Sequence, residues 1–221
     1  MQETLVASTP KKVAIVGGGP TRKKAPFKDP SWEIWAFSSI KWRFPRITRW
    51  FEIHHLTDLR QQLATRKAGR RSYRNYMRFM RRLKCPVYMA KAHRKIPNSV
   101  VFPAKTLVKE FGRCFTSTAS FLVALAISEG YDVIGLWGID PTSKSYSYQR
   151  PTLKYLLAIA KQRGIKIVLP KGLRLKIPKK PRFVRTKVLY AYGWRSKHAW
   201  WRDRVRKRLR ALRRRRRRRR R

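Results

Sequence analysis

Seven short runs of apolar, β-branched and aromatic residues alternate along this chain with longer segments of helical character. The runs are Val13–Val16, Glu33–Phe37, Trp50–His54, Pro86–Met89, Ser99–Phe102, Val133–Trp137 and Ile165–Leu169. Several are apolar throughout and do not alternate with polar residues, as is typical of strands buried on both faces of a parallel sheet. The alternation predicts right-handed strand–helix–strand crossovers, and hence a doubly wound, mostly parallel, Rossmann-like α/β sheet.

Three segments between these runs are predicted to be helices: roughly Asp58–Leu83, Ser117–Glu129 and Pro151–Arg163. The second has the clearest boundaries. Thr116 and Ser117 are good N-cap residues, the interior is continuously apolar, and Gly130 stands where a helix is expected to stop.

The charge of the chain indicates a polyanionic partner. With 43% hydrophobic residues among 221, the chain has enough apolar material for one core, yet its formal net charge is +47. From Lys171 onward there are 25 Lys or Arg and one acid, whereas the preceding 170 residues carry 32 Lys or Arg and nine acids. Such a field attracts polyanions and is screened by salt. Nucleic acid is the favoured partner, and an anionic membrane surface is the alternative.

Cysteine and hydropathy patterns exclude several classes of protein. Cys85 and Cys114 are the two cysteines of the chain and form no CxxC motif or Cys/His cluster, so we expect neither a structural metal site nor a disulfide framework. The longest apolar run, Phe121–Ser128, is far shorter than the ~20 residues of a membrane-spanning helix. VAIVGGG is too short for the apolar region of a signal peptide. A cytoplasmic location is therefore expected.

The composition divides the chain into three parts: a Rossmann-like nucleotide-binding domain over 1–170, a Pro/Lys-rich linker with an aromatic cluster over 171–200, and an Arg-rich helix or tail over 201–221. In the tail, apolar residues recur at helical spacing among arginines, which suits phosphate binding or, with Trp200 and Trp201, an anionic bilayer. The predicted nucleic-acid-binding residues are Arg202, Arg204, Arg206, Lys207, Arg208, Arg210, Arg213, Arg214, Arg215 and Arg216.

The first strand runs directly into a glycine loop, KVAIVGGGPT. Gly17–Gly19 can adopt positive φ and leave backbone N–H groups exposed to an anion, and Thr21 adds a hydroxyl group. The alternative is a tight turn with no ligand. The loop lacks the GK[ST] ending of a P-loop. Arg22 stands where the dinucleotide fingerprint has its third glycine, and the second strand ends in Ser38 and Ser39 where that fingerprint has an acid, so NAD is disfavoured.

Candidate catalytic residues follow two of the predicted strands. Asp140 closes a buried strand, where a carboxylate can bind ribose hydroxyls, hold a metal, act as a base or simply bond nearby loop N–H groups. Glu52 and His54 share one face of the third strand and His55 points to the other. A His beside a carboxylate is either a general base or a hydrogen-bonded strand end.

The expected nucleotide site combines the glycine loop with the start of one predicted helix and with the run just past the GID strand. Thr116 and Ser117 can bind phosphate at a helix N-terminus or act as caps, and Tyr148, Gln149 and Arg150 can stack on a base and pair with a phosphate or pack as an ordinary loop. The predicted nucleotide-binding residues are Gly17, Gly18, Gly19, Pro20, Thr21, Ser38, Thr116, Ser117, Gly138, Tyr148, Gln149 and Arg150.

The segment FTSTASFLVALAISEGYDVIGLWGID, residues 115–140, resembles the corresponding stretch of bacterial sialyltransferases that use CMP-sialic acid. Hydroxymethylpterin pyrophosphokinase-like proteins share its outline, and both families have a G-x-GPS-type loop that GGGPT matches with Thr21 in place of serine. A group of uncharacterised bacteriophage proteins is similar over about residues 12–170, including WEIWAFSS, RWFEIHHL, PVYM, YSYQRP and IKIVLP. A phage-encoded protein would act in the host cytoplasm.

This resemblance implies a Rossmann-like fold and a nucleotide or nucleotide-sugar ligand, and it departs from the sialyltransferases at one position that matters. Their catalytic histidine is expected after the GID strand, but this chain has no histidine between His93 and His198. The base would then be His54, His55 or Asp140. The sequence therefore favours a nucleotide-dependent transferase of glycosyl or phosphoryl groups, held on nucleic acid by its tail. The alternative is a non-catalytic nucleic-acid-binding protein on the same scaffold.

Overall fold

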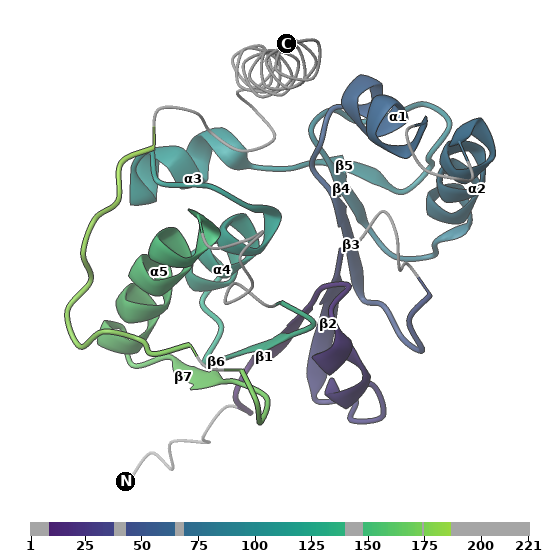
Figure 1. Cartoon of the computed structure of the whole chain (residues 1–221). Coiled ribbons are helices and arrows are strands. Elements are labelled where there is room, and N and C mark those ends of the chain that lie inside the picture. Colours follow the sequence, from purple (N-terminus) through teal and green to yellow (C-terminus); the bar gives the residue numbers. More distant parts are fainter. Residues whose placement is uncertain (1–8, 38–42, 65–68, 140–147, 174, 187–221) are drawn as a thin grey trace, which may run out of the picture.

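A parallel sheet of seven strands forms the centre of the structure, a computed structural model that describes residues 9–37, 43–64, 69–139, 148–173 and 175–186. The order across the sheet is β5-β4-β3-β2-β1-β6-β7 (Figure 1). The strands are β1 (Lys12–Val16), β2 (Trp32–Ala36), β3 (Arg49–Glu52), β4 (Val87–Met89), β5 (Ser99–Val101), β6 (Val133–Trp137) and β7 (Lys166–Val168). The predicted doubly wound α/β fold is confirmed.

The strand order reverses beside β1. The chain builds outward from β1 through β2, β3, β4 and β5, and then crosses back to place β6 on the other side of β1. Val16 at the end of β1 pairs in register with Ala36 of β2 and with Trp137 of β6. In open α/β sheets, ligands bind outside the carboxyl ends of the strands at such a reversal. The loops that follow β1 and β6 are therefore the expected place for a ligand.

Helices cover both faces of the sheet. They are the 3-10 helix η1 (Pro20–Lys24) and the α-helices α1 (Leu56–Ala64), α2 (Gly69–Arg82), α3 (Ala104–Phe111), α4 (Thr118–Ser128) and α5 (Arg150–Gln162). In Figure 1, α3, α4 and α5 gather on one side, and α1 and α2 lie beyond β3, β4 and β5.

One predicted helix, Asp58–Leu83, is wrong as a single element, because α1 and α2 occupy that segment as two helices that pack on each other. A straight helix of this length would extend about 39 Å. Leu63 of α1 and Tyr76 of α2 are instead buried in the same apolar cluster.

The predicted start and stop of α4 are confirmed. Ser117 is the N-cap: its Oγ accepts from Ser120 N at 3.1 Å, and Ser120 Oγ accepts from Ser117 N at 3.1 Å. After the helix, Gly130 has φ +69°, the left-handed conformation that glycine adopts at low cost. The helix is buried from Thr118 to Ile127 because it contacts β1 of the sheet and both neighbouring helices, α3 and α5. This explains why its sequence is apolar on every side.

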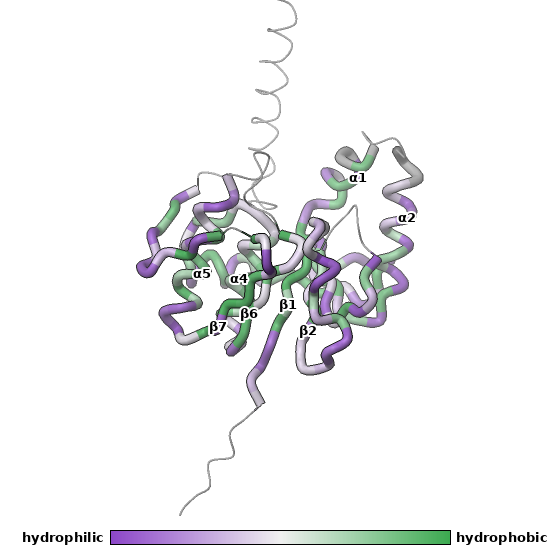
Figure 2. Tube along the Cα trace, turned by 60° about the horizontal axis from the view of Figure 1, so that its bottom comes forward, coloured by the Kyte–Doolittle hydropathy of each residue, from purple (hydrophilic) through white to green (hydrophobic). Residues whose placement is uncertain are grey.

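Alternating residues of the central strands divide the core into two layers. Val13 and Ile15 of β1 pack with α4 and α5, whereas Ala14 and Val16 pack on the opposite face with Ile34 and Trp137. The period of two along each strand explains this division. Figure 2 shows the hydrophobic residues following β1 and β6 through the middle of the molecule. A strand that contributes to two cores needs apolar residues on both faces, and β1 has them at all four buried positions, Val13–Val16.

A strap of mostly extended chain, residues 171–173 and 175–186, runs from the end of β7 to α3 (Figure 1). Leu175 is buried in the main core, and Phe183 packs edge-on against Tyr155 of α5 with ring centroids 5.5 Å apart. At its end, Thr186 N donates to Arg113 O at 2.7 Å. The sequence predicts an extended linker here, and the structure adds that the strap is packed on the body. In the sequence, the Arg-rich segment 201–221 begins fifteen residues after Thr186.

Phe183→Ala is expected to release the strap. Phe183 covers Gly112, where a Cβ would lie 2.8 Å from the Phe183 ring, and it is 54% exposed. The loss in unfolding free energy should therefore be small, about 1 kcal/mol. Trypsin should cut after Arg182 or Arg185 several-fold faster, while the control Val100→Ala, on the opposite edge of the sheet, should leave the rate unchanged. Equal cutting rates in the three proteins would mean that Phe183 does not hold the strap.

Candidate functional site

The loops after β1 and β6 are hydrogen-bonded to each other at the strand-order reversal. Gly17 N donates to Trp137 O and Gly19 N donates to Gly138 O, both at 2.8 Å. Gly138 N donates to Thr21 Oγ1, also at 2.8 Å. These three bonds extend the pairing of β1 and β6 beyond the strands. They make the glycine loop and the Gly138 turn a single rigid rim of the candidate site.

The glycines of this loop are required by close packing. A Cβ on Gly17 would lie 2.6 Å from Gly138 O, and a Cβ on Gly19 would lie 2.9 Å from the same oxygen. The sequence-based expectation of positive φ at Gly17–Gly19 is wrong, since Gly138, with φ +64°, is the residue of this rim in the left-handed region. The expectation that this loop exposes its N–H groups is also wrong for Gly17 and Gly19, whose N–H groups are bonded to β6 and its turn.

Arg22 is a rim residue that sequence reasoning treated as the loss of a third glycine. Its Nη1 donates to Gly18 O at 3.1 Å, which holds the half-buried guanidinium against the glycine loop. That bond uses one of the five N–H donors of a guanidinium. Arg22 therefore places a positive charge at the rim where the loop amides are already bonded.

The N-terminus of α4 lies at the same carboxyl edge. Because Ser117 and Ser120 cap each other, the capping role anticipated for Ser117 is the one its hydroxyl performs in this structure. Thr116 differs: its Oγ1 is buried and has no hydrogen-bond partner among the residues that the structure describes. A buried hydroxyl without a partner is costly, at about 1–3 kcal/mol. A ligand oxygen at this position would remove that cost.

The start of α5 is tied to the segment before α4. Thr152 Oγ1 donates to Cys114 O at 2.6 Å, so the two helix starts are held together. Gln149 is the N-cap residue of α5, and its side-chain Nε2 donates to the exposed Tyr148 hydroxyl at 3.0 Å. Arg150 is the first residue of α5. The three residues thus flank a helix start at the carboxyl edge.

Glu52 and His54 meet at the carboxyl end of β3. Glu52 Oε1 lies 2.5 Å from His54 Nδ1 and also accepts from His54 N at 3.3 Å. The Glu52 side chain is 2% exposed and the His54 ring 16%. A carboxylate on Nδ1 selects the imidazole tautomer in which Nδ1 carries the proton. Proton transfer to or from a substrate would then take place at Nε2.

Two aromatic residues complete the surroundings of Glu52. Tyr76 OH, from α2, donates to Glu52 Oε2 at 2.8 Å, and Trp50 Nε1 donates to Tyr76 OH at 3.1 Å. Burial, together with the negative charge of Glu52, raises the pKa of Tyr76 well above its usual value. The phenol therefore remains a donor, and both Glu52 oxygens are bonded. Sequence reasoning did not find Tyr76, because it lies 24 residues from Glu52 in a basic helix.

Other residues predicted for the site have no observed part in the contacts among Glu52, His54 and Tyr76. His55 uses its backbone oxygen to accept from Asp58 N and Leu59 N, both at 3.0 Å, where α1 begins. Ser38, Asp140 and the tail arginines lie outside the described residues. Across the described ranges, no three His, Cys, Asp or Glu side chains are grouped to hold a metal ion. No helix within those ranges is long and apolar enough to cross a membrane.

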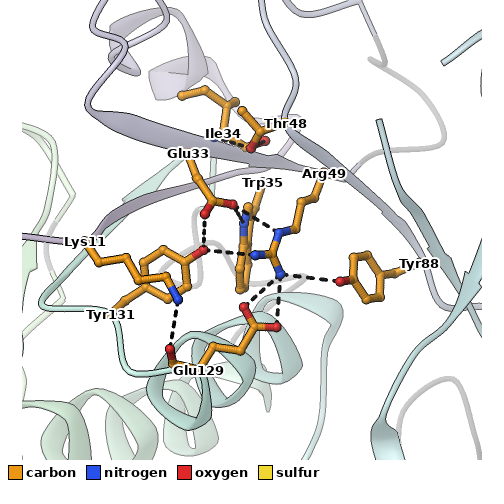
Figure 3. Close-up of polar contacts among 9 residues, drawn as sticks. All are labelled: Lys11, Glu33, Ile34, Trp35, Thr48, Arg49, Tyr88, Glu129 and Tyr131. Carbon is orange, nitrogen blue, oxygen red and sulfur yellow. Dashed lines mark hydrogen bonds and ion pairs between the residues drawn. The ribbon is translucent and has the colours of Figure 1, made fainter. Parts of the chain in front are cut away.

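A second polar cluster lies at the opposite, amino edge of the sheet (Figure 3). Arg49 Nε donates to Glu33 Oε2 at 3.1 Å, its Nη1 donates to both oxygens of Glu129 at 3.0 and 2.8 Å, and its Nη2 donates to Tyr131 OH at 3.2 Å. Its guanidinium carbon stands 4.7 Å from the centre of the Trp35 ring.

Glu33 in this cluster is held ionised by its neighbours. Burial by itself raises the pKa of Glu33, but hydrogen bonds from Tyr131 and Trp35 and the charge of Arg49 outweigh it, so the pKa lies below its usual value. Burial and the bond to Glu33 raise the pKa of Tyr131 far above its usual value, so it stays a donor. Because the bonds join β2, β3 and the start of β6, we assign this cluster to stability.

Comparison with known proteins identifies the fold. No protein-family model matches the chain, and no curated protein matches it by sequence. Among solved structures, the sialyltransferase CstII with a trisaccharide acceptor and CMP is 14% identical, with a TM-score of 0.50 over 81% of this chain and 89% of that chain. CstII from Campylobacter jejuni with a substrate analogue, cytidine-5'-monophosphate, is 16% identical, with a TM-score of 0.48 over 85% and 99%. At 14% identity, the likeness to CstII with the trisaccharide acceptor and CMP shows a shared fold alone. The resemblance to phage and pyrophosphokinase-like proteins stays a prediction.

Proposed function

We propose that this protein is a nucleotide-dependent transferase, and that glycosyl transfer from a nucleotide-sugar is its reaction. The observation that carries the proposal is the contact between buried Glu52 and His54 Nδ1 at the carboxyl edge of the sheet. A histidine oriented by a carboxylate is the usual arrangement of a general base. The fold shared with CstII, a sialyltransferase solved with CMP, supports the choice of donor class.

The donor phosphate is assigned to the rim at β1 and β6. Arg22 supplies a positive charge beside the glycine loop, and the α4 N-terminus supplies a favourable dipole together with the buried Thr116 hydroxyl. β3 is two strands from β1, which is about 10 Å at the usual strand spacing. A nucleotide-sugar is long enough to place its phosphate at the rim and its sugar near His54.

In the proposed reaction, the acceptor hydroxyl gives its proton to His54 Nε2 while its oxygen forms a bond to the anomeric carbon. The bond from that carbon to the donor phosphate oxygen breaks, and the nucleoside phosphate leaves. Glu52 stabilises the imidazolium, and Tyr76 holds Glu52 in place. Arg22 and the start of α4 stabilise the negative charge that grows on the leaving phosphate.

His54→Asn is expected to lower the rate of nucleotide release by 10²- to 10⁴-fold, since it removes a general base. Release of CMP, UDP or GDP would be measured for a panel of nucleotide-sugars, with and without simple saccharide acceptors. The neighbouring variant His55→Asn is the control and should retain activity. The melting shift that the donor causes should persist in both variants, because neither residue is assigned to donor binding.

The competing function is a non-catalytic nucleic-acid-binding protein with a Rossmann-like scaffold. One observation favours it: Gly17 and Gly19 have their N–H groups bonded within the protein, as a loop without a ligand requires. The two functions are separated by the same panel. If no nucleotide-sugar or nucleoside triphosphate at millimolar concentration releases a nucleotide or raises the melting temperature, the transferase is ruled out. In either case, we propose that the Arg-rich tail, Arg202–Arg221, holds the protein on nucleic acid.

A further inference from the structure

Helix α2 presents a row of arginines to solvent. Arg74, Arg78, Arg81 and Arg82 are all exposed, and their spacing of three and four residues places them on one helical face. Side chains at these intervals lie about 5–6 Å apart at Cβ. We name these four residues the α2 basic face. It belongs to the folded body and is separate in sequence from the Arg-rich tail.

The stretch of sequence that contains the α2 basic face has no acidic residue. Between Asp58 and Glu110 the chain has fifteen Lys or Arg residues and no Asp or Glu. Arg94 and Lys95, in the segment from β4 to β5, are exposed, and Ile96 beside them packs in the same apolar cluster as α2. A solvated surface that serves only solubility usually mixes both signs of charge. The single sign here indicates a surface for an anion.

The apolar face of α2 is fully used by the core. Tyr76 and Met80 are buried, and Tyr73, Met77 and Phe79 pack against the same cluster. Phe79 packs edge-on against the ring of Trp50, with centroids 4.9 Å apart. A helix that binds a bilayer must insert apolar side chains among the lipids. Since those of α2 face inward, its exposed side offers charge alone, which favours nucleic acid over a membrane.

We infer that the α2 basic face binds the phosphate backbone of nucleic acid. Arginines at this spacing can pair with successive phosphates, and contacts of this kind carry affinity without sequence preference. The surface is independent of the proposed transferase chemistry, because none of its four arginines is assigned to the rim or to the Glu52–His54 pair. The body would then position the nucleic acid, and the tail would add affinity.

The test compares two full-length variants of equal charge. The first carries Arg74→Gln, Arg78→Gln, Arg81→Gln and Arg82→Gln, with glutamine chosen because it retains helix propensity. The control carries Lys109→Gln, Lys161→Gln, Lys166→Gln and Lys171→Gln, at exposed positions on α3, α5 and the β7 side. Both keep the tail. Affinity for a fluorescent 20-base-pair DNA duplex and for a 20-nucleotide RNA would be measured from 50 to 300 mM salt.

If each of the four arginines contacts one phosphate, the α2 variant should reduce the slope of log K against log salt by about 3.6, since each phosphate contact on DNA contributes about 0.9. Its affinity at 150 mM salt should fall at least tenfold, while the control should change the slope by less than 1. Equal losses in the two variants would overturn the inference, because binding would then follow net charge alone. Loss of binding to phosphatidylserine vesicles with unchanged nucleic-acid binding would also overturn it. Unchanged melting temperatures would show that the variants remain folded.

Discussion

Gly138→Ala is expected to lower the unfolding free energy by about 3 kcal/mol or more. Two costs add at this position. Gly138 has φ +64°, where alanine is disfavoured by about 1–2 kcal/mol, and its Cβ would lie 2.3 Å from Gly17 O. Backbone cannot yield as a flexible side chain can, and overpacking of this kind costs about 1–3 kcal/mol. Thermal unfolding should show a melting temperature about 10 °C lower.

The matched control is Gly164→Ala. Gly164 has φ +78° but no heavy atom within 4 Å of an added Cβ, so the conformational cost remains and the collision is absent. Its melting temperature should fall by only about 3 °C, corresponding to about 1 kcal/mol. If the two alanine variants lose equal stability, the close packing of the β1 and β6 loops is not what requires glycine at 138. The same pair of variants would also report whether donor binding depends on the rim.

Arg49→Met is expected to destabilise the protein by about 2–3 kcal/mol at neutral pH. The change leaves Glu33 and Glu129 together in a half-buried site without the guanidinium that binds both. Breaking a buried ion pair from one side costs about 3–5 kcal/mol. The expected value is smaller because the side chains of Arg49, Glu33 and Glu129 are 19–34% exposed to solvent, which weakens the interaction between their charges. Urea unfolding would measure the difference.

The effect of Arg49→Met should depend on pH in a defined direction. The folded-state pKa of Glu33 is depressed, so its ionisation stabilises the fold above the unfolded-state pKa, and this contribution is lost as pH falls through the folded-state pKa. The difference between the parent and the variant should therefore be full at pH 7 and shrink below about pH 4. A difference that stays constant from pH 7 to pH 3 would exclude a charge interaction as its cause.

Two further variants test the assignment to stability. Arg163→Met removes an exposed ion pair with Glu110, at 3.0 Å, and should cost less than about 0.5 kcal/mol. Adding Glu129→Gln to Arg49→Met should recover part of the loss, because it removes one of the two carboxylates left without a partner. Further destabilisation by the second change would mean that Glu129 contributes through contacts other than that with Arg49.

The candidate site was partly predictable from the sequence. The correct predictions concern features that are set by residues close together in the chain. Ser117 as a cap and Gly130 as a stop follow from backbone requirements within one turn of a helix, so the local sequence contains all the information. The period-two pattern predicts that Glu52 and His54 share a strand face, and the structure brings their side chains into contact. The environment of this pair was beyond local reasoning, since Tyr76 reaches Glu52 from a helix that the sequence assigns to a longer element.

For the glycine loop, the sequence predicts the location correctly but not the reason for the glycines. GGGPT after a buried strand indicates the carboxyl edge of the sheet, and β1 does end there. The sequence suggested glycines that adopt unusual φ and expose amides. In the structure, Gly17 and Gly19 are needed because Gly138 lies against them from a strand more than 110 residues away. That contact exists only once β6 has crossed back beside β1.

The sequence by itself determined the class of fold, the positions of the strands and the positive sign of the protein's electrostatic field. Those properties depend on residues that are near one another in the chain, through apolar runs of strand length, local caps and the excess of Lys and Arg. The tertiary structure alone decided which distant residues come together: Tyr76 on Glu52, and Arg49 between two carboxylates. Strand order and register bring these groups together, and no local pattern encodes a neighbour that arrives from another strand.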